Sequence, residues 1–342
     1  MHSVQSILAG TPVRELLREH PFSGTVFESV NLPPPETQTL AEWLAATPEA
    51  RFLEFGMSRR SFAGRFVSVI QKLEENAEEE EPLIESLTIR GGHDKNGAPE
   101  KLELVLYPGD TVCLVGPTGA GKSRLLADIE CLAQRDTVTG REVTLSGRGC
   151  GRDRGSVLIA QLSQSMNFVT DLPVKAFLKL HGESVGRGEP EALAEKVLAE
   201  ANALAGERFS PKTLLTQLSG GQTRALMIAD IAFISCAPIL LIDEIENAGI
   251  DKRRAMALLR SSGKILLLST HDPVLALSCS RLLQLRCGAV VSLREQTETD
   301  RRNASFLADI EAVFNGVRDD LRLGREPNEL TWDSFKEEAH AK

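Results

Sequence analysis

The sequence contains few aromatic residues, no long apolar run and no excess of basic charge. Aromatic residues make up 5% of its 342 positions, with one Tyr and two Trp. The most apolar region, residues 225–242, is interrupted by Asp230, Ser235 and Pro238. It therefore falls short of the ~18 uninterrupted apolar residues of a membrane helix. The formal net charge of −9 disfavours nucleic acid as a partner, since neutralising phosphates requires a surplus of Lys and Arg.

The six cysteines form no C-x-x-C pair and no zinc-like spacing with His, which is typical of reduced thiols in the cytoplasm. The first residues, Met1 to Val4, lack the basic and apolar regions of a secretory signal. We therefore expect a cytoplasmic location, at the inner face of the membrane if the protein serves a membrane subunit. With 42% apolar and 25% charged residues, the composition is that of a folded globular protein.

The first part of the chain is predicted to be a helical module over residues 1–73. Phe62, Phe66, Val69, Ile70 and Leu73 recur at the spacing of one helical face. An acidic tract at residues 74–82 follows and ends on a proline, which predicts a linker. A solvated helix end explains the tract equally well.

After the acidic tract, short β-type runs alternate with helical stretches. Alternating leucines near residues 83–107 indicate an antiparallel β portion. Four continuous apolar runs are typical of strands buried on both faces of a largely parallel sheet: Thr111 to Val115, Val157 to Ala160, Ile239 to Ile242 and Ile265 to Leu268. The chain is thus expected to hold an α/β domain over residues 83–295 and a helical C-terminal extension over residues 296–342.

A phosphate-binding loop follows the first of these runs and precedes a helical stretch. Its residues fit G-x-x-x-x-G-K-[ST]: Gly116, Pro117, Thr118, Gly119, Ala120, Gly121, Lys122 and Ser123. The glycines allow backbone N–H groups to surround phosphate oxygens, and the helix N-terminus adds its positive end. Lys122 is expected to bridge the β- and γ-phosphates, and the Ser123 hydroxyl to bind Mg²⁺. ATP and Mg²⁺ are therefore the expected cofactors.

Two adjacent carboxylates, Asp243 and Glu244, end the buried run that starts at Ile239. Ligands of open α/β folds bind at the carboxyl edge of the sheet, where these side chains should lie. Asp243 suits the Mg²⁺ shell, and Glu244 is the candidate base that polarises the attacking water. Helix capping is the plainer alternative for a pair of acids at a strand end.

The segment Leu218-Ser219-Gly220-Gly221-Gln222 matches the LSGGQ signature, so the chain resembles the ATP-binding cassette (ABC) ATPases over about residues 83–295. The resemblance implies a P-loop NTPase fold with a helical subdomain at about residues 165–225. It further implies that Ser219, Gly220, Gly221 and Gln222 contact the γ-phosphate of ATP held by a second copy, giving a head-to-tail homodimer. A helix start with free amides suits such an anion site.

Two further family elements are expected by resemblance. His271, which follows the run Ile265 to Leu268, resembles the switch histidine that contacts the γ-phosphate and helps to position water. The Q-loop glutamine, which lies near the metal and the γ-phosphate, is expected to be Gln161, with Gln164 as the rival.

The sequence also departs from the family. Arg124 stands where a Thr is usual and is expected near the α-phosphate. In the D-loop region, residues 246–251, the aspartate is one position late. The adenine-stacking position has only His93 as a candidate, because Tyr107 is too close to the phosphate-binding loop.

The downstream task is open from sequence. The family favours the nucleotide-binding subunit of a transporter, coupled to a separate membrane subunit. The alternative is a soluble ATPase that remodels or activates a cytosolic protein or metalloenzyme, which the N-terminal module favours. A role in DNA repair is disfavoured by the acidic charge and by the lack of a long coiled-coil insertion.

Overall fold

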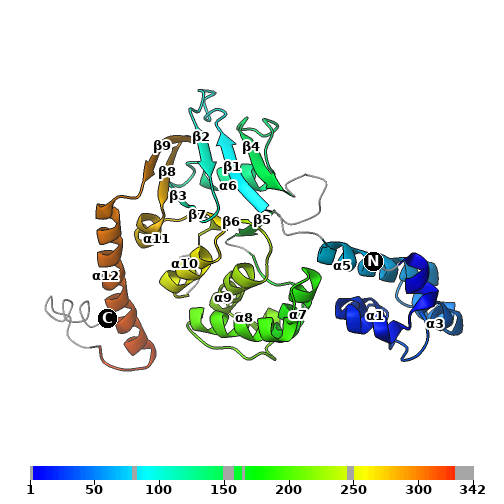
Figure 1. Ribbon diagram of the computed structural model, residues 1–342. Coiled ribbons are helices and arrows are strands. Elements are labelled where there is room, and N and C mark those ends of the chain that lie inside the picture. Colours follow the sequence, from blue (N-terminus) through cyan, green and yellow to red (C-terminus); the bar gives the residue numbers. More distant parts are fainter. Residues whose placement is uncertain (1–2, 79–82, 149–157, 164–165, 245–249, 328–342) are drawn as a thin grey trace. The chain divides into compact units, whose positions relative to one another are not determined.

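The computed structural model (Figure 1) describes residues 3–78, 83–148, 158–163, 166–244 and 250–327. Internal contacts divide the chain into two compact units. Unit 1 combines residues 1–82 with residues 167–236, and unit 2 combines residues 83–166 with residues 237–342. The two β-sheets belong to unit 2.

The N-terminal part of unit 1 is a set of short helices around an aromatic core. Its elements are η1 (Ser6–Gly10), α1 (Val13–Glu19), η2 (Pro21–Gly24), α2 (Thr25–Glu28), α3 (Leu40–Ala46), α4 (Glu49–Leu53) and α5 (Arg59–Glu78). The ring of Phe27 meets those of Trp43, Phe62 and Phe66 edge-on, with centroids 5.0, 5.2 and 5.4 Å away. Such contacts stabilise a core beyond the area that the rings bury.

Helix α5 confirms the helical stripe predicted from sequence, with Phe62, Phe66 and Ile70 fully buried. The helix continues to Glu78, so the first half of the predicted linker is helical, and Glu74 at its start is buried rather than solvated. Residues 79–82 lie outside the described residues.

The second part of unit 1 is the helical subdomain. It contains α7 (Val174–Ser184), α8 (Pro190–Leu204), η3 (Leu215–Gln217) and α9 (Gly220–Phe233). The subdomain therefore extends past the expected end near residue 225. His181 Nδ1 on α7 is hydrogen-bonded to Asp230 Oδ1 on α9 at 2.8 Å, which fixes the two helices against each other.

The main sheet of unit 2 has the strand order β5-β6-β7-β3-β8-β9. The strands are β3 (Thr111–Val115), β5 (Ile159–Leu162), β6 (Ile239–Asp243), β7 (Ile265–Ser269), β8 (Arg281–Arg286) and β9 (Ala289–Glu295). The first five in this order are parallel, and β9 pairs antiparallel with β8. The expected α/β fold is thus confirmed. Val157 lies outside the described residues, and β5 starts at Ile159.

A second, antiparallel sheet has the order β2-β1-β4, formed by β1 (Leu83–Arg90), β2 (Glu103–Leu106) and β4 (Glu142–Arg148). The sequence analysis missed β4. Its residues lack clear alternation, and its place depends on pairing with β1, for example Ile89 opposite Val143. Helix α6 (Lys122–Glu130) shares one apolar core with residues of both sheets.

Three helices complete unit 2 (Figure 1): α10 (Lys252–Ser261), α11 (Pro273–Ser278) and α12 (Glu298–Arg322). Asp251 caps α10 by accepting a hydrogen bond from the Arg254 amide at 3.0 Å. Asp272 caps α11 in the same way. The predicted C-terminal extension is helical over α12, and residues 328–342 lie outside the described residues.

Candidate active site

The phosphate-binding loop joins β3 to α6, the strand–loop–helix order that its motif requires. Gly121 has φ +105°, and a Cβ there would lie 2.9 Å from the Cα of Gly288. Only glycine fits this close approach of two backbones. The Gly288 amide donates to the carbonyl of Ala120 at 2.8 Å, so the β8–β9 turn supports the loop.

Lys122 is the first residue of α6 and is buried, with 7% of its surface exposed. Its Nζ donates to the carbonyl of Gly116 at 2.8 Å and lies 3.3 Å from Nε2 of His271. The ammonium is thereby held over the loop that should cradle phosphates. His271, predicted from the sequence to lie at this site, follows the carboxyl end of β7 by two residues.

Ser123 and Asp243 meet across the site, since Ser123 Oγ donates to Asp243 Oδ2 at 2.9 Å. Two oxygen ligands in one place fit Mg²⁺, which is usually held by one or two carboxylates together with substrate phosphates. Among the described residues, no group of three or more His, Cys, Asp and Glu side chains could hold a metal. The pair therefore suits a nucleotide-bound magnesium ion rather than a protein-only cage.

Glu244 follows β6 directly and has a left-handed backbone, with φ +54°. This conformation is uncommon for a residue with a side chain, and such residues cluster at functional sites. The Glu244 amide donates to the carbonyl of Ser269 at 3.0 Å, which anchors it to β7. Its Oε1 lies 4.0 Å from His271 Nε2. The two side chains predicted to handle the attacking water thus face each other.

Gln161 does not join this cluster, contrary to the expectation. With its amide nitrogen toward Glu130, it donates to both carboxylate oxygens, at 2.8 and 2.6 Å. Glu130 ends α6, two turns away from Lys122. The strand register explains the difference, because Gln161 pairs with Leu241, two residues before Asp243. Gln164, the rival candidate, lies outside the described residues.

Arg124 extends along its own helix, where its Nε lies 3.6 Å from Asp128 Oδ1. Nearly half of its side chain is exposed. The expected place near the α-phosphate remains a prediction for this residue.

Lys95 is a residue near the site that the sequence analysis missed. Its Nζ donates to the carbonyl of Gly119 at 2.8 Å, and its amide donates to the carbonyl of Cys287 at 2.9 Å. A second cation therefore touches the phosphate-binding loop. No local pattern signals it, because the loop after β1 reaches Gly119 only through the folding of the antiparallel sheet.

His93, the adenine candidate, is exposed, and its Nδ1 lies 3.2 Å from the carbonyl of Asp94. Tyr107 is also exposed. An adenine contact by His93 remains a prediction. In the D-loop region, residues 246–249 lie outside the described residues, and Asp251 serves as the α10 cap.

The signature segment lies in unit 1 and begins α9. Ser219 and Gln222 form a capping box: the Ser219 amide donates to Gln222 Oε1 at 2.9 Å, and the Gln222 amide donates to Ser219 Oγ at 3.4 Å. Gly220 has open space where a Cβ would be. The segment thus presents an uncrowded helix N-terminus, as an anion site requires.

A partly buried lysine links the histidine loop to the C-terminal helix. Lys252 Nζ donates to Asp272 Oδ2 and to Glu311 Oε1, each at 2.6 Å. Burial alone lowers the pKa of Lys252, but its bonds to Asp272 and Glu311 outweigh this and raise the pKa, so the ammonium stays charged. Asp272 follows His271, and its other oxygen caps α11. The position of the histidine loop therefore depends on contacts with α10 and α12.

In the part of the chain that the structure describes, no helix is long and apolar enough to cross a membrane.

Comparisons with known proteins agree with this geometry. The sequence profile of the family described as ABC transporter matches residues 99–247. The uncharacterized ABC transporter ATP-binding protein MJ0121 of Methanocaldococcus jannaschii is 44% identical over 246 residues, which cover 70% of this chain and 94% of that protein. The macrolide export ATP-binding/permease protein MacB of Bradyrhizobium diazoefficiens is 28% identical over 249 residues. That match covers 68% of this chain and 36% of MacB, so the chain spans about a third of that relative's length.

Solved structures of cassettes are similar as well. The ATP-binding cassette MJ0796, in a dimeric post-hydrolysis state bound to ADP and Pi, is 26% identical and has a TM-score of 0.48. The match covers 62% of this chain and 99% of that one. From the sequence relatives and from the site that its own residues form, this chain belongs to the ATP-binding cassette family and is an ATP-binding ATP hydrolase.

Proposed function

We propose that the chain binds MgATP between two copies of itself and hydrolyses it to drive a transporter's membrane subunit, to which it binds peripherally. The observation that carries the catalytic part is the convergence of Lys122, Ser123, Asp243, Glu244 and His271 on one loop. The names of the relatives, ATP-binding protein and ATP-binding/permease protein, support the transporter.

Each residue has a distinct task in this proposal. Lys122 neutralises phosphate charge, while Ser123 and Asp243 hold Mg²⁺, which offsets the charge that develops on the transferred phosphoryl group. Glu244 accepts the proton of the attacking water, and His271 orients that water against the γ-phosphate. Ser219 and Gly221 of a second copy close the site over the same phosphate, so the dimer forms with ATP and opens after hydrolysis.

A Glu244→Gln variant tests the catalytic role and the dimer together. It should hydrolyse ATP about 10²–10⁴-fold more slowly, the usual loss for a general base. It should still bind ATP, because Lys122, Ser123 and Asp243 are unchanged. Size-exclusion chromatography with light scattering should detect a stable dimer in MgATP and a monomer in ADP.

Glu103→Gln is the matched control, since Glu103 is exposed on β2 and pairs only with Arg90 among the described residues. It should keep wild-type turnover. Wild-type turnover in Glu244→Gln would refute the base, and a variant that binds ATP yet stays monomeric would refute the shared site.

The second candidate function is that of a soluble ATPase acting on a cytosolic protein. It is favoured by the N-terminal helices, which have their own aromatic core and lie outside residues 99–247. We propose residues 1–73 as a partner-docking module, whether the partner is a membrane subunit or a soluble protein. Purification from native cells with and without detergent separates the two tasks. A membrane protein retained in detergent supports transport, whereas a soluble partner that stays bound without detergent supports the alternative.

A further inference from the structure

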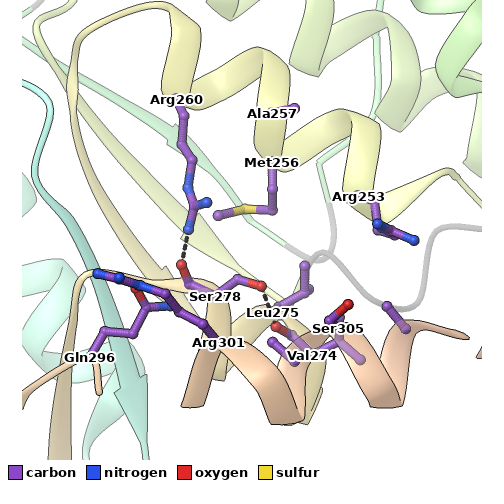
Figure 2. A pocket seen from close by; sticks show the side chains of 12 residues that line it. Arg253, Met256, Ala257, Arg260, Val274, Leu275, Ser278, Gln296, Arg301 and Ser305 are labelled. Atoms are coloured by element: carbon purple, nitrogen blue, oxygen red, sulfur yellow. Dashed lines mark hydrogen bonds between the residues drawn. The ribbon is translucent and has the colours of Figure 1, made fainter. Parts of the chain in front are cut away.

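A cavity of about 390 Å³ opens between α10, α11 and α12, away from the phosphate-binding loop. Its apolar lining comes from all three helices and includes Met256, Val274, Leu275, Ala304 and Ala308. Figure 2 shows Met256 and Arg260 reaching from α10 toward α11. A cavity of this size with an apolar lining can accept one bulky side chain or a small ligand.

Three arginines surround the apolar lining: Arg253, Arg260 and Arg301. In the described part of the chain, none of them pairs with a carboxylate. Arg260 donates to the backbone carbonyl of Ser278, and Arg301 Nε donates to Gln296 Oε1 at 3.0 Å. A guanidinium binds carboxylates in a fork geometry, so the cavity is suited to an acidic ligand with an apolar body.

Helix α12 ends in a capping motif that changes the direction of the chain. Gly324 has φ +69° and its amide donates to Leu321, while the Arg325 amide donates to the carbonyl of Asp320 at 2.8 Å. These two bonds, with a left-handed glycine between them, form a Schellman cap. Glu326 and Pro327 therefore do not continue along the axis of α12.

The segment that follows, residues 326–342, has the complementary chemistry. Its sequence contains three large apolar residues and five acids against two lysines: Leu330, Trp332 and Phe335, with Glu326, Glu329, Asp333, Glu337 and Glu338. Acids flank the aromatic residues closely, as in Trp332-Asp333. One short stretch thus offers both an apolar body and carboxylates.

The segment is long enough to reach the cavity. From Ala308 on the cavity wall to Asp320, whose carbonyl accepts a hydrogen bond from the Arg325 amide, α12 rises ~18 Å, at 1.5 Å for each of its residues. From Arg325 to Trp332 an extended chain spans up to ~23 Å, at about 3.3 Å per residue. A tethered segment also has an effective concentration in the millimolar range, so even a weak contact is occupied.

We propose that residues 326–342 dock into this cavity, with Trp332 against Met256 and Leu275 and with neighbouring carboxylates on Arg253 and Arg301. Residues of α11, the helix that begins directly after Asp272, form part of the cavity wall. The docked segment therefore packs on α11, the helix that directly follows the histidine loop in the chain.

Tryptophan fluorescence tests the docking in the full chain. The chain has two tryptophans, Trp43 and Trp332, so subtracting the emission of a Trp332→Phe variant isolates Trp332. A docked Trp332 should emit at shorter wavelength and be quenched by acrylamide several-fold less efficiently than in a synthetic peptide of residues 326–342. At 1 M NaCl, where the Debye length is ~3 Å, the protection should weaken.

An Arg253→Gln/Arg301→Gln double variant should expose Trp332 to acrylamide almost as fully as in the peptide. Arg302→Gln is the matched control, because Arg302 lies on the same helix but pairs with Glu298 at 2.7 Å and does not line the cavity. The control should leave Trp332 protected. Circular dichroism verifies that each variant is folded. Quenching of Trp332 in the wild-type chain equal to that of the peptide, or unchanged in the double variant, would overturn the proposal.

Discussion

Arg141 is fully buried, and its replacement should destabilise unit 2 more than any exposed charge would. Its Nε and Nη2 donate to the two oxygens of Glu100 at 2.8 and 2.9 Å, and its Nη1 donates to Asp128 Oδ2 at 3.1 Å. The side chains of the two acids are 0% and 1% exposed. Burial alone lowers the pKa of Arg141, but its bonds to Glu100 and Asp128 outweigh this and raise it, so it stays charged.

An Arg141→Met variant keeps an apolar stem but leaves Glu100 buried without its cation and Asp128 with only the 3.6 Å contact to Arg124. Breaking a buried ion pair in this way typically costs about 3–5 kcal/mol of unfolding free energy. For a unit of this size, each kcal/mol lowers Tm by about 2–4 °C, so the expected decrease is about 6–20 °C. Differential scanning calorimetry measures it.

Nucleotide binding should weaken in the same variant. Arg141 Nη2 also donates to the carbonyl of Gly288 at 2.6 Å, and the Gly288 amide supports the phosphate-binding loop at Ala120. Arg90→Met is the matched control, because Arg90 is half exposed and its pair with Glu103 spans 3.6 Å. An exposed pair of this kind contributes about 0–1 kcal/mol. If Arg141→Met lowered Tm no more than Arg90→Met does, the reasoning about the buried network would be wrong.

Two further variants test the site. Lys122→Ala should abolish ATP binding or turnover, because it removes the cation that lies 2.8 Å from the Gly116 carbonyl. The control variant Lys101→Ala, at an exposed position, should keep both. Titration with a fluorescent ATP analogue measures binding, and unchanged binding and turnover in Lys122→Ala would contradict the assignment. Lys252→Met should lower kcat several-fold with little change in KM for ATP, because Asp272, next to His271, loses its ammonium donor. Glu311→Gln should lower kcat less, because its side-chain amide oxygen can still accept a hydrogen bond from Lys252. Steady-state kinetics decide it, and a change in KM alone would refute the positioning role.

Errors in the sequence analysis arose where a position depends on strand register or on distant contacts. Gln161 ends an apolar run, as a Q-loop residue would, but the pairing of β5 with β6 places it two residues too early and beside Glu130. Strand β4 was missed because it belongs to a sheet with β1, more than fifty residues earlier in the chain. Lys95 touches the phosphate-binding loop through a hydrogen bond that no motif describes.

By itself, the sequence determined the phosphate-binding loop, the acidic strand end at Asp243 and Glu244, and the family, because these depend on short contiguous patterns that the chemistry of phosphate and magnesium requires. It also determined the buried strands β3, β6 and β7, since continuous apolar residues cannot remain in water, whereas β5 is a half-exposed edge strand and β8 and β9 were not predicted. Only the tertiary structure decided which distant side chains meet: His271 with Lys122 and Glu244, Arg141 with Glu100 and Asp128, and Lys252 with Glu311. Such pairs join residues from separate elements, and their distances follow from the register of the strands and the packing of the helices rather than from any local pattern.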